Sequence, residues 1–274
     1  MSLSIHTNMS AISATHSIGA ATQTVGRTLD RISSGLRVVS ARDDAAALGV
    51  ATNLNTTARA IRVAIRNAND GVSIIQHTES ALQTATDIMQ RMRELGVQSA
   101  SETLQNKERA YIETEFSELK DEIERVALDY NFNGMNLTDG LTTTLSVQVG
   151  IYDNAASRVD IQLANVRKLH SDISSTSIAT VTSARQALAD LDSTLDNANS
   201  MRSELGATQN RLESTIKNSG VYTESMLGAA SQIQDANMAV ETAELARSQI
   251  MKTAASSVLT QSKNITNVVV DLIA

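Results

Sequence analysis

The feature that most constrains this chain is the complete absence of proline over 274 residues. Average usage is about 5%, which would place roughly a dozen prolines in a chain of this length. Proline interrupts helix interiors because it removes a backbone donor and clashes with the preceding turn. A chain without it is therefore expected to consist mostly of long, continuous helices.

The composition predicts thin seams between helices and no thick core. Aromatic residues make up only 2%, although large rings normally supply much of the packing mass of a core. Hydrophobic residues still reach 42%, mostly small and aliphatic, which suits an elongated helical bundle. The chain has no cysteine, which excludes disulfides and thiolate metal sites. Its net charge of −7 has the wrong sign for a nucleic-acid binder.

The first residues lack the basic region, apolar core and cleavage site of a secretory signal. No run of about 18 apolar residues is present, so we expect no membrane insertion. These rules alone predict a cytoplasmic protein, unless it leaves the cell by a route that needs no cleaved signal.

Apolar residues recur at steps of three and four along most of the chain, which predicts helices. Residues 2–40 read as a weak amphipathic helix and residues 43–99 as a longer one. Any single short seam is equally typical of an ordinary surface helix, so the seams must find partners elsewhere in the chain. We predict three antiparallel helices around one narrow core, formed by Ile88, Met92, Leu95, Ile112, Phe116, Leu119, Ile123, Leu191, Leu195, Leu205 and Leu212.

The pattern changes between residues 131 and 179. Turn signals at 131–134 and 139–140 precede two segments, 145–150 and 159–163, in which apolar and polar residues alternate. Such alternation predicts a β-hairpin. Residues 171–183 are rich in serine and threonine, and we expect an exposed connection there.

The last segment, about 229–274, has a helical pattern and an unusually apolar end: Val268, Val269, Val270, Leu272 and Ile273. Chain termini are usually polar and frayed. Burial would stabilise each of these side chains by roughly 1.5 to 3 kcal/mol. Covering the whole tail would therefore contribute a free energy on the order of 10 kcal/mol. No other part of the chain reads as a core thick enough to do so alone.

Motifs at both ends resemble the terminal regions of bacterial flagellins. The N-terminal matches are residues 31–46, 69–82, 91–100, 132–134 and 147–150, in the family's order. The C-terminal matches are residues 202–212, 246–250 and 257–262. The sequence departs from the family pattern at Ala47, Gly49 and Gly96, all small-for-small changes.

The resemblance implies a mainly α fold: an elongated antiparallel helical bundle with a small β-hairpin region between its helical halves. Residues 1–42 with 229–274 would form the inner tube of a filament. Residues 43–228 would form the surrounding helical rod, with the hairpin region at 131–179 and no large variable outer domain. The resemblance also implies terminal segments that fold only on assembly. The expected inner-tube residues are Leu29, Ile32, Leu36, Val258, Leu259, Val268, Val269, Val270, Leu272 and Ile273.

In function, the resemblance implies a structural subunit that leaves through the flagellar type III apparatus and polymerises outside the cell for swimming motility. Its partners would be further copies or other flagellins, an export chaperone, the filament cap and the hook-filament junction proteins. It needs no cofactor or metal. Positions Arg91, Leu95 and Glu115 match those that animal Toll-like receptors contact, and residues 30–51 resemble the peptide that plants perceive.

No catalytic constellation is found in the sequence. Asp43 and Asp44 are adjacent, and neighbours in a helix do not face one another, so capping is the better interpretation. The four histidines are scattered, and no metalloprotease, phosphate-loop or nucleophile-elbow motif occurs. A hook-filament junction protein is the closest rival. A signalling or adhesive coiled coil explains the heptads but not the paired end motifs, and an enzyme is the weakest alternative.

Overall fold

The computed structural model describes residues 7–273, with side chains described for residues 7–264. The chain divides into two compact units. The terminal unit comprises Met1–Thr56 and Ser225–Ala274, and the central unit comprises Thr57–Glu224.

In chain order the elements are α1 (Met9–Ser34), α2 (Ala45–Ser99), α3 (Asn106–Asp129), β1 (Asn131–Phe132), β2 (Met135–Asn136), β3 (Thr144–Gln148), the 3-10 turn η1 (Ala155–Ser157), β4 (Arg158–Gln162), α4 (Val166–Ile173), α5 (Val181–Gln234) and α6 (Met238–Ile273). The predicted mainly α fold is confirmed.

The long helices begin where the sequence supplies a capping group. The carboxylate of Asp44 accepts the backbone N–H of Ala47 at 2.9 Å and caps α2, as predicted. Gln105 and Glu108 form a capping box at the start of α3. No proline interrupts α2 or α5, which continue for 55 and 54 residues.

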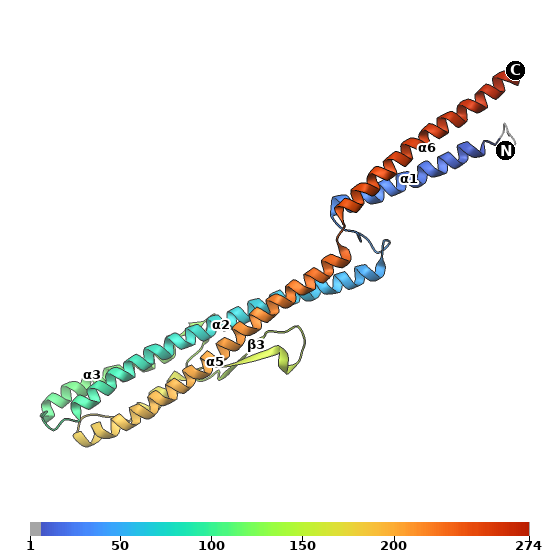
Figure 1. Ribbon diagram of the computed structural model, residues 1–274. Helices are drawn as coiled ribbons and strands as arrows, with labels where there is room; N and C mark the ends of the chain where they lie inside the picture. Colours follow the sequence, from blue (N-terminus) through green and yellow to red (C-terminus); the bar gives the residue numbers. More distant parts are fainter. Residues whose placement is uncertain (1–6, 274) are drawn as a thin grey trace. The chain divides into compact units, whose positions relative to one another are not determined.

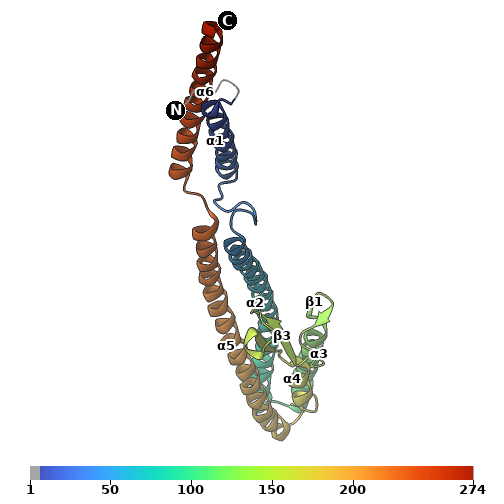
Figure 2. The same cartoon turned by 90° about the vertical axis from the view of Figure 1, so that its right-hand side faces the viewer.

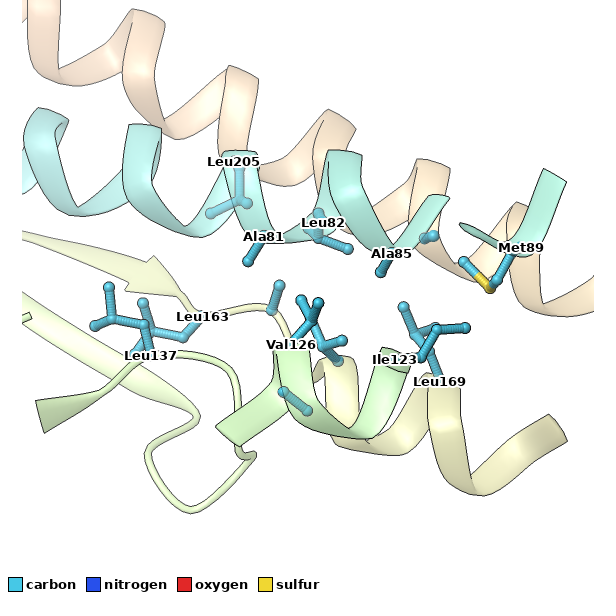
Figure 3. Packing of buried hydrophobic residues seen from close by; sticks show 14 of the residues in the cluster. Ala81, Leu82, Ala85, Met89, Ile123, Val126, Leu137, Leu163, Leu169 and Leu205 are labelled. Atoms are coloured by element: carbon cyan, nitrogen blue, oxygen red, sulfur yellow. The ribbon is translucent and has the colours of Figure 1, made fainter. Parts of the chain in front are cut away.

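The core of the central unit is a narrow seam shared by α2, α3 and α5. Figures 1 and 2 both show α2 and α5 side by side, and Figure 3 shows Ala81, Leu82, Ala85 and Met89 of α2 facing Ile123 and Val126 of α3. All eleven residues of the predicted seam lie in this cluster or pack against it. Seven are buried: Met92, Leu95, Phe116, Ile123, Leu191, Leu205 and Leu212. Four are half-buried at its edge: Ile88, Ile112, Leu119 and Leu195.

The expected exposed connection at residues 171–183 is only partly correct, because most of its residues are exposed but three are buried. Helix α4 covers the first part, and Ile173, Thr176 and Ile178 are buried. The carboxylate of Glu113 accepts the N–H of Ile178 at 2.6 Å, and the hydroxyl of Ser99 donates to the Ile178 carbonyl at 2.5 Å. The segment is held by partners far away in sequence, which local composition does not reveal.

The predicted hairpin is present. β3 pairs antiparallel with β4, with Val147 opposite Val159. Val147 and Ile161 face the core and approach α2 at Gly71, where an added Cβ would lie 3.3 Å from Val147 and 3.4 Å from Ile161. A second, shorter pair, β1 and β2, turns through Asn133 and Gly134, both with positive φ.

Two glycines test how tightly the seam is packed. Gly206, inside α5, has no atom within 4 Å of an added Cβ, so Gly206→Ala should raise the free energy of unfolding by about 0.5 to 1 kcal/mol through helix propensity. At Gly71 the new methyl also meets Leu212 at 3.3 Å, so Gly71→Ala should be less stable than Gly206→Ala by about 1 kcal/mol or more. Urea unfolding followed by circular dichroism measures both. Equal gains at the two sites would contradict the close packing at Gly71.

Candidate assembly surface of the terminal helices

Helices α1 and α6 form an antiparallel pair with a seam of small or polar residues. Figure 1 shows the two helices side by side. Buried positions are spaced by seven residues or a multiple of seven, at Ala14, Ala21 and Thr28 on α1, and at Glu241, Ser248 and Ser262 on α6. A seven-residue spacing keeps one narrow stripe of each helix against the other. Among the residues whose side chains are described, none of these fully buried positions holds a large aliphatic side chain, and Ile18, Val25 and Ile32, one turn further along α1, are half-buried.

Polar contacts fix the pair near both ends of α1. The Asn8 side chain donates to the Ser262 carbonyl at 3.0 Å, and the Ser262 hydroxyl donates back to the Asn8 side-chain oxygen at 2.9 Å. Arg31 pairs with Glu241 at 3.4 Å, and the Glu241 side chain is only 9% exposed. Because small side chains specify register poorly, these directional contacts define how α1 and α6 align.

A short connector separates α5 from α6, where the sequence pattern predicted helix from about residue 229 onward. The helix ends at Gln234 and resumes at Met238 because the Asn237 side chain accepts the N–H of Ala239 at 3.1 Å and starts a new helix. Leu36 forms an isolated antiparallel bridge with Asp235. Gly35, in the left-handed region at φ 72°, ends α1 and turns the chain into this bridge.

Asp43 organises the second connector, between α1 and α2. Its carboxylate accepts the Ser40 N–H at 3.0 Å, the Ser40 hydroxyl at 3.1 Å and the Val39 N–H at 3.3 Å. The backbone hydrogen bond from Ser40 is the main cause that lowers the pKa of this carboxyl group. Asp43 and Asp44 therefore serve two different backbone caps and do not form an acid–base pair.

Among the described residues of the terminal unit, Val38 is the one large apolar side chain that is buried, and the others are exposed or half-buried. The buried hydrophobic residues of this unit are Ala14, Ala21, Val38, Ala51 and Ala230. Its exposed large hydrophobic residues are Met9, Ile12, Leu29, Val39, Val50, Met238, Val240, Ile250, Met251 and Val258. A groove of about 660 Å³ along α1 and α6 is lined by Ile12, His16, Leu259 and Lys263, among others. The described part of this unit thus leaves many large apolar side chains exposed or only partly covered.

The predicted inner-tube residues fall into three groups. Leu29 and Val258 are 48% and 54% exposed. Ile32, Leu36 and Leu259 are half-buried. Val268, Val269, Val270, Leu272 and Ile273 have side chains that lie outside the described residues. Sequence reasoning did not anticipate the exposure of Ile250 and Met251, which lie next to each other on α6.

The three predicted receptor positions are close together, but only two are on the surface. Arg91 of α2 donates to Glu115 of α3 at 2.8 and 3.1 Å, and also to Glu94 at 2.9 Å. The hydrogen bond to Glu115 is the largest of the effects that raise the pKa of Arg91. Leu95 is 2% exposed and belongs to the core. A partner that approached this surface would meet the Arg91–Glu115 ion pair and not the buried Leu95.

Neither a metal site nor a membrane span is found in the described part of the chain. No group of three or more histidine, cysteine or acidic side chains there could hold a metal ion. No described helix is long and apolar enough to cross a bilayer.

One of the four histidines has a packing role. The His77 ring packs edge-on against the rings of Tyr130 and Phe132, with centroids 6.2 Å apart in both cases.

These features define a helical protein whose terminal helices leave apolar surface to be covered. Residues 5–143 match the bacterial flagellin N-terminal helical region, and residues 188–273 match the C-terminal helical region. A flagellin of Halalkalibacterium halodurans is 35% identical over 269 residues, which cover 98% of this chain and 99% of the relative. The flagellar filament 33 kDa core protein of Treponema phagedenis is 34% identical, with coverage of 98% and 99%. The chain therefore belongs to the bacterial flagellin family and is a structural subunit of a flagellar filament.

Solved structures agree with this assignment. The crystal structure of Bacillus cereus flagellin has a TM-score of 0.50 and 25% identity, and it covers 56% of this chain and 88% of that one. A putative flagellar hook-associated protein from Vibrio parahaemolyticus has a TM-score of 0.62 at 17% identity, covering 70% of this chain and 100% of that one. At that identity the second comparison shows a shared fold and nothing more.

Proposed function

We propose that this chain is exported from the cell and polymerises outside it through its terminal unit, in a structural role without catalytic chemistry. In this proposal residues 1–42 and 229–274 line the inner tube of the filament, and residues 43–228 surround it. The names of the relatives, flagellin and flagellar filament core protein, support the polymer.

The observation that carries the proposal is that the terminal unit buries mainly small residues and exposes many large apolar ones. Its described core is built from alanines and one valine, while Ile12, Ile250 and Val258 are each more than half exposed. Apolar surface gains about 25 cal/mol per Å² when it is removed from water, so covering these exposed side chains with a neighbouring copy would add stabilisation that a single copy lacks. Neighbouring copies would cover this surface, together with the apolar tail at 268–273.

Exposed terminal helices also account for the other partners. An apolar surface that must cross the cell before assembly needs temporary protection, which an export chaperone would supply. The filament cap and the hook-filament junction proteins would contact the same ends at the two limits of the polymer.

Electron microscopy of the purified chain under polymerising conditions tests the proposal. We expect long filaments from the full chain, and none from a variant that lacks Val268 to Ala274. Circular dichroism should show that the truncated chain keeps the helices of its central unit, because that core lies between residues 68 and 212. A full chain that forms only short caps or rings would favour a junction protein, and normal filaments from the truncated chain would refute the role of the tail.

We also propose that animal Toll-like receptors recognise the free subunit at the Arg91–Glu115 pair. Because exposed arginines at a centre of contact are frequent hot spots, Arg91→Ala with Glu115→Ala should weaken the reporter-cell response by about tenfold or more. Arg93→Ala is the matched control, since Arg93 is similarly exposed but pairs with Asp192 of α5 at 2.6 Å. No response to the unmodified subunit, or an equal loss with the control, would refute this recognition.

Plant perception is a separate proposal about residues 30–51. In the structure this segment spans the end of α1, the connector organised by Asp43 and the start of α2. A synthetic peptide of these residues, tested on plant cells beside one with Ala47→Gly and Gly49→Ala, shows whether the two departures from the family pattern change perception.

A further inference from the structure

One face of α2 in the central unit carries three arginines that form no ion pair with any described residue. Arg59, Arg62, Val63 and Arg66 follow steps of three, one and three residues, so they share one stripe of the helix. All four are exposed, and Val63 is 45% exposed. Ile61 is buried on another side of α2, which directs the arginine stripe outward.

The arginines of this stripe differ from four others in the same unit. Arg91, Arg93, Arg125 and Arg202 each have a carboxylate within ion-pair distance. Among the described residues, Arg59, Arg62 and Arg66 have none, and Asp70, one turn further along, forms no ion pair with them. Like charges three or four residues apart destabilise a helix, so an unneutralised stripe has an energetic cost in the free subunit. An acidic surface on another molecule would remove that cost.

Helix α3 provides a surface of the opposite character. Its 24 residues hold eight carboxylates against four cationic side chains. On the side facing away from the seam, Glu118 and Asp121 are exposed, and neither has an ion-pair partner among the described residues. Tyr111 and Leu128, 68% and 49% exposed, flank the two carboxylates on the same side of the helix.

We propose that the Arg59–Arg66 face of α2 in one copy binds the Glu118–Asp121 face of α3 in a second copy. The inference rests on the proposed polymerisation, since it needs neighbouring copies of this chain. Two different faces of one subunit make a heterologous contact, which repeats without closing and so suits a filament. Val63 on one face and Leu128 on the other would supply apolar area beside the charges. The charges would set register and orientation between copies.

Charge reversal tests the pairing. Arg62→Glu with Arg66→Glu should raise the critical concentration for polymerisation at least about tenfold, and so should Glu118→Lys with Asp121→Lys, because like charges then meet at the contact. The variant that combines all four changes should return to within about threefold of the unmodified chain. Arg211→Glu with Lys217→Glu is the matched control, because both side chains lie exposed on α5 without an ion pair among the described residues. It should polymerise normally.

The outcomes separate this inference from the proposed function. If the unmodified chain forms no filaments, the polymerisation proposal fails. If it forms filaments and the α2 reversal does not weaken them, or the combined variant is not restored, the pairing is overturned.

A second measurement does not depend on the charge-reversed variants folding. The natural chain contains no cysteine, so filaments grown from a mixture of Arg62→Cys and Asp121→Cys subunits report the contact directly. A short bifunctional thiol reagent should give cross-links between the two variants. Cross-links absent from such filaments would also overturn the pairing.

Discussion

Replacing Ile250 and Val258 with serine is expected to abolish filament growth while the free subunit keeps its helical content. Both side chains lie on α6 and are exposed, 69% and 54%, so the free subunit loses little packing when they are shortened. In a filament each would be buried, and each large aliphatic side chain contributes about 1.5 to 3 kcal/mol on burial. The same loss recurs in every subunit, so we expect no pelletable polymer at concentrations about a hundredfold above the normal critical concentration.

The control for this result is a matched change in the central unit. Leu141 is 82% exposed, so Leu141→Ser removes an exposed aliphatic side chain of similar size away from the terminal helices. Sedimentation should show normal polymer for Leu141→Ser, and circular dichroism should show equal helicity for both variants. Filaments of Ile250→Ser with Val258→Ser at the normal critical concentration would contradict assembly through this face of α6.

The sequence predicts the central unit well because its heptad seam is a local pattern. Phe116 and Ile123 are seven residues apart on α3, and both are fully buried, as the spacing requires. The hairpin is equally local, since alternation along each strand places Val147 and Val159 on one face. Repeated steps of this kind need no knowledge of distant residues.

Contacts between residues far apart in sequence were not predictable in this way. Asn8 and Ser262 are separated by 254 positions, and the sequence around neither residue predicts the two hydrogen bonds between them. Arg109 is similar: it is buried at 4% exposure and donates to the carbonyls of Ser99 and Ser101, which fixes the turn between α2 and α3. From sequence alone, an arginine at that position is expected to face solvent. Its burial is explained only by the two carbonyl groups that accept its hydrogen bonds.

The terminal helices show why a hydrophobic pattern alone does not locate burial. Leu29 and Val258 were expected at an interface because of their spacing and family resemblance, and both are about half exposed in a single copy. The residues buried between α1 and α6 are smaller ones, such as Ala14 and Ser248. A seam of small residues lets the two helices approach closely and leaves larger side chains for other partners. The hydrophobic pattern identifies an apolar stripe on these helices. It does not show whether the same subunit or a neighbouring one covers that stripe.

Phe116→Ala is expected to have the largest effect on the folding of the free subunit. Phe116 is fully buried, and the Lys120 ammonium lies 5.6 Å from the centre of its ring. Its removal should lower the free energy of unfolding of the central unit by about 3 to 5 kcal/mol, since a thin seam has few neighbours able to fill the cavity. Urea unfolding of monomeric protein, followed by circular dichroism, measures this loss. Tyr111→Ala on the same helix is the control, and because Tyr111 is 68% exposed it should shift stability by less than about 1 kcal/mol.

The two substitution sets should then separate folding from assembly. Phe116→Ala leaves the surface of the terminal unit intact, so at high concentration it should still form filaments, because polymer binds only folded subunits and shifts the equilibrium toward them by mass action. Ile250→Ser with Val258→Ser should behave in the opposite way, with a normal unfolding curve and no polymer. If both sets lowered monomer stability equally, the terminal helices would already share the core of the free subunit, and the proposed division of roles between the two units would be wrong.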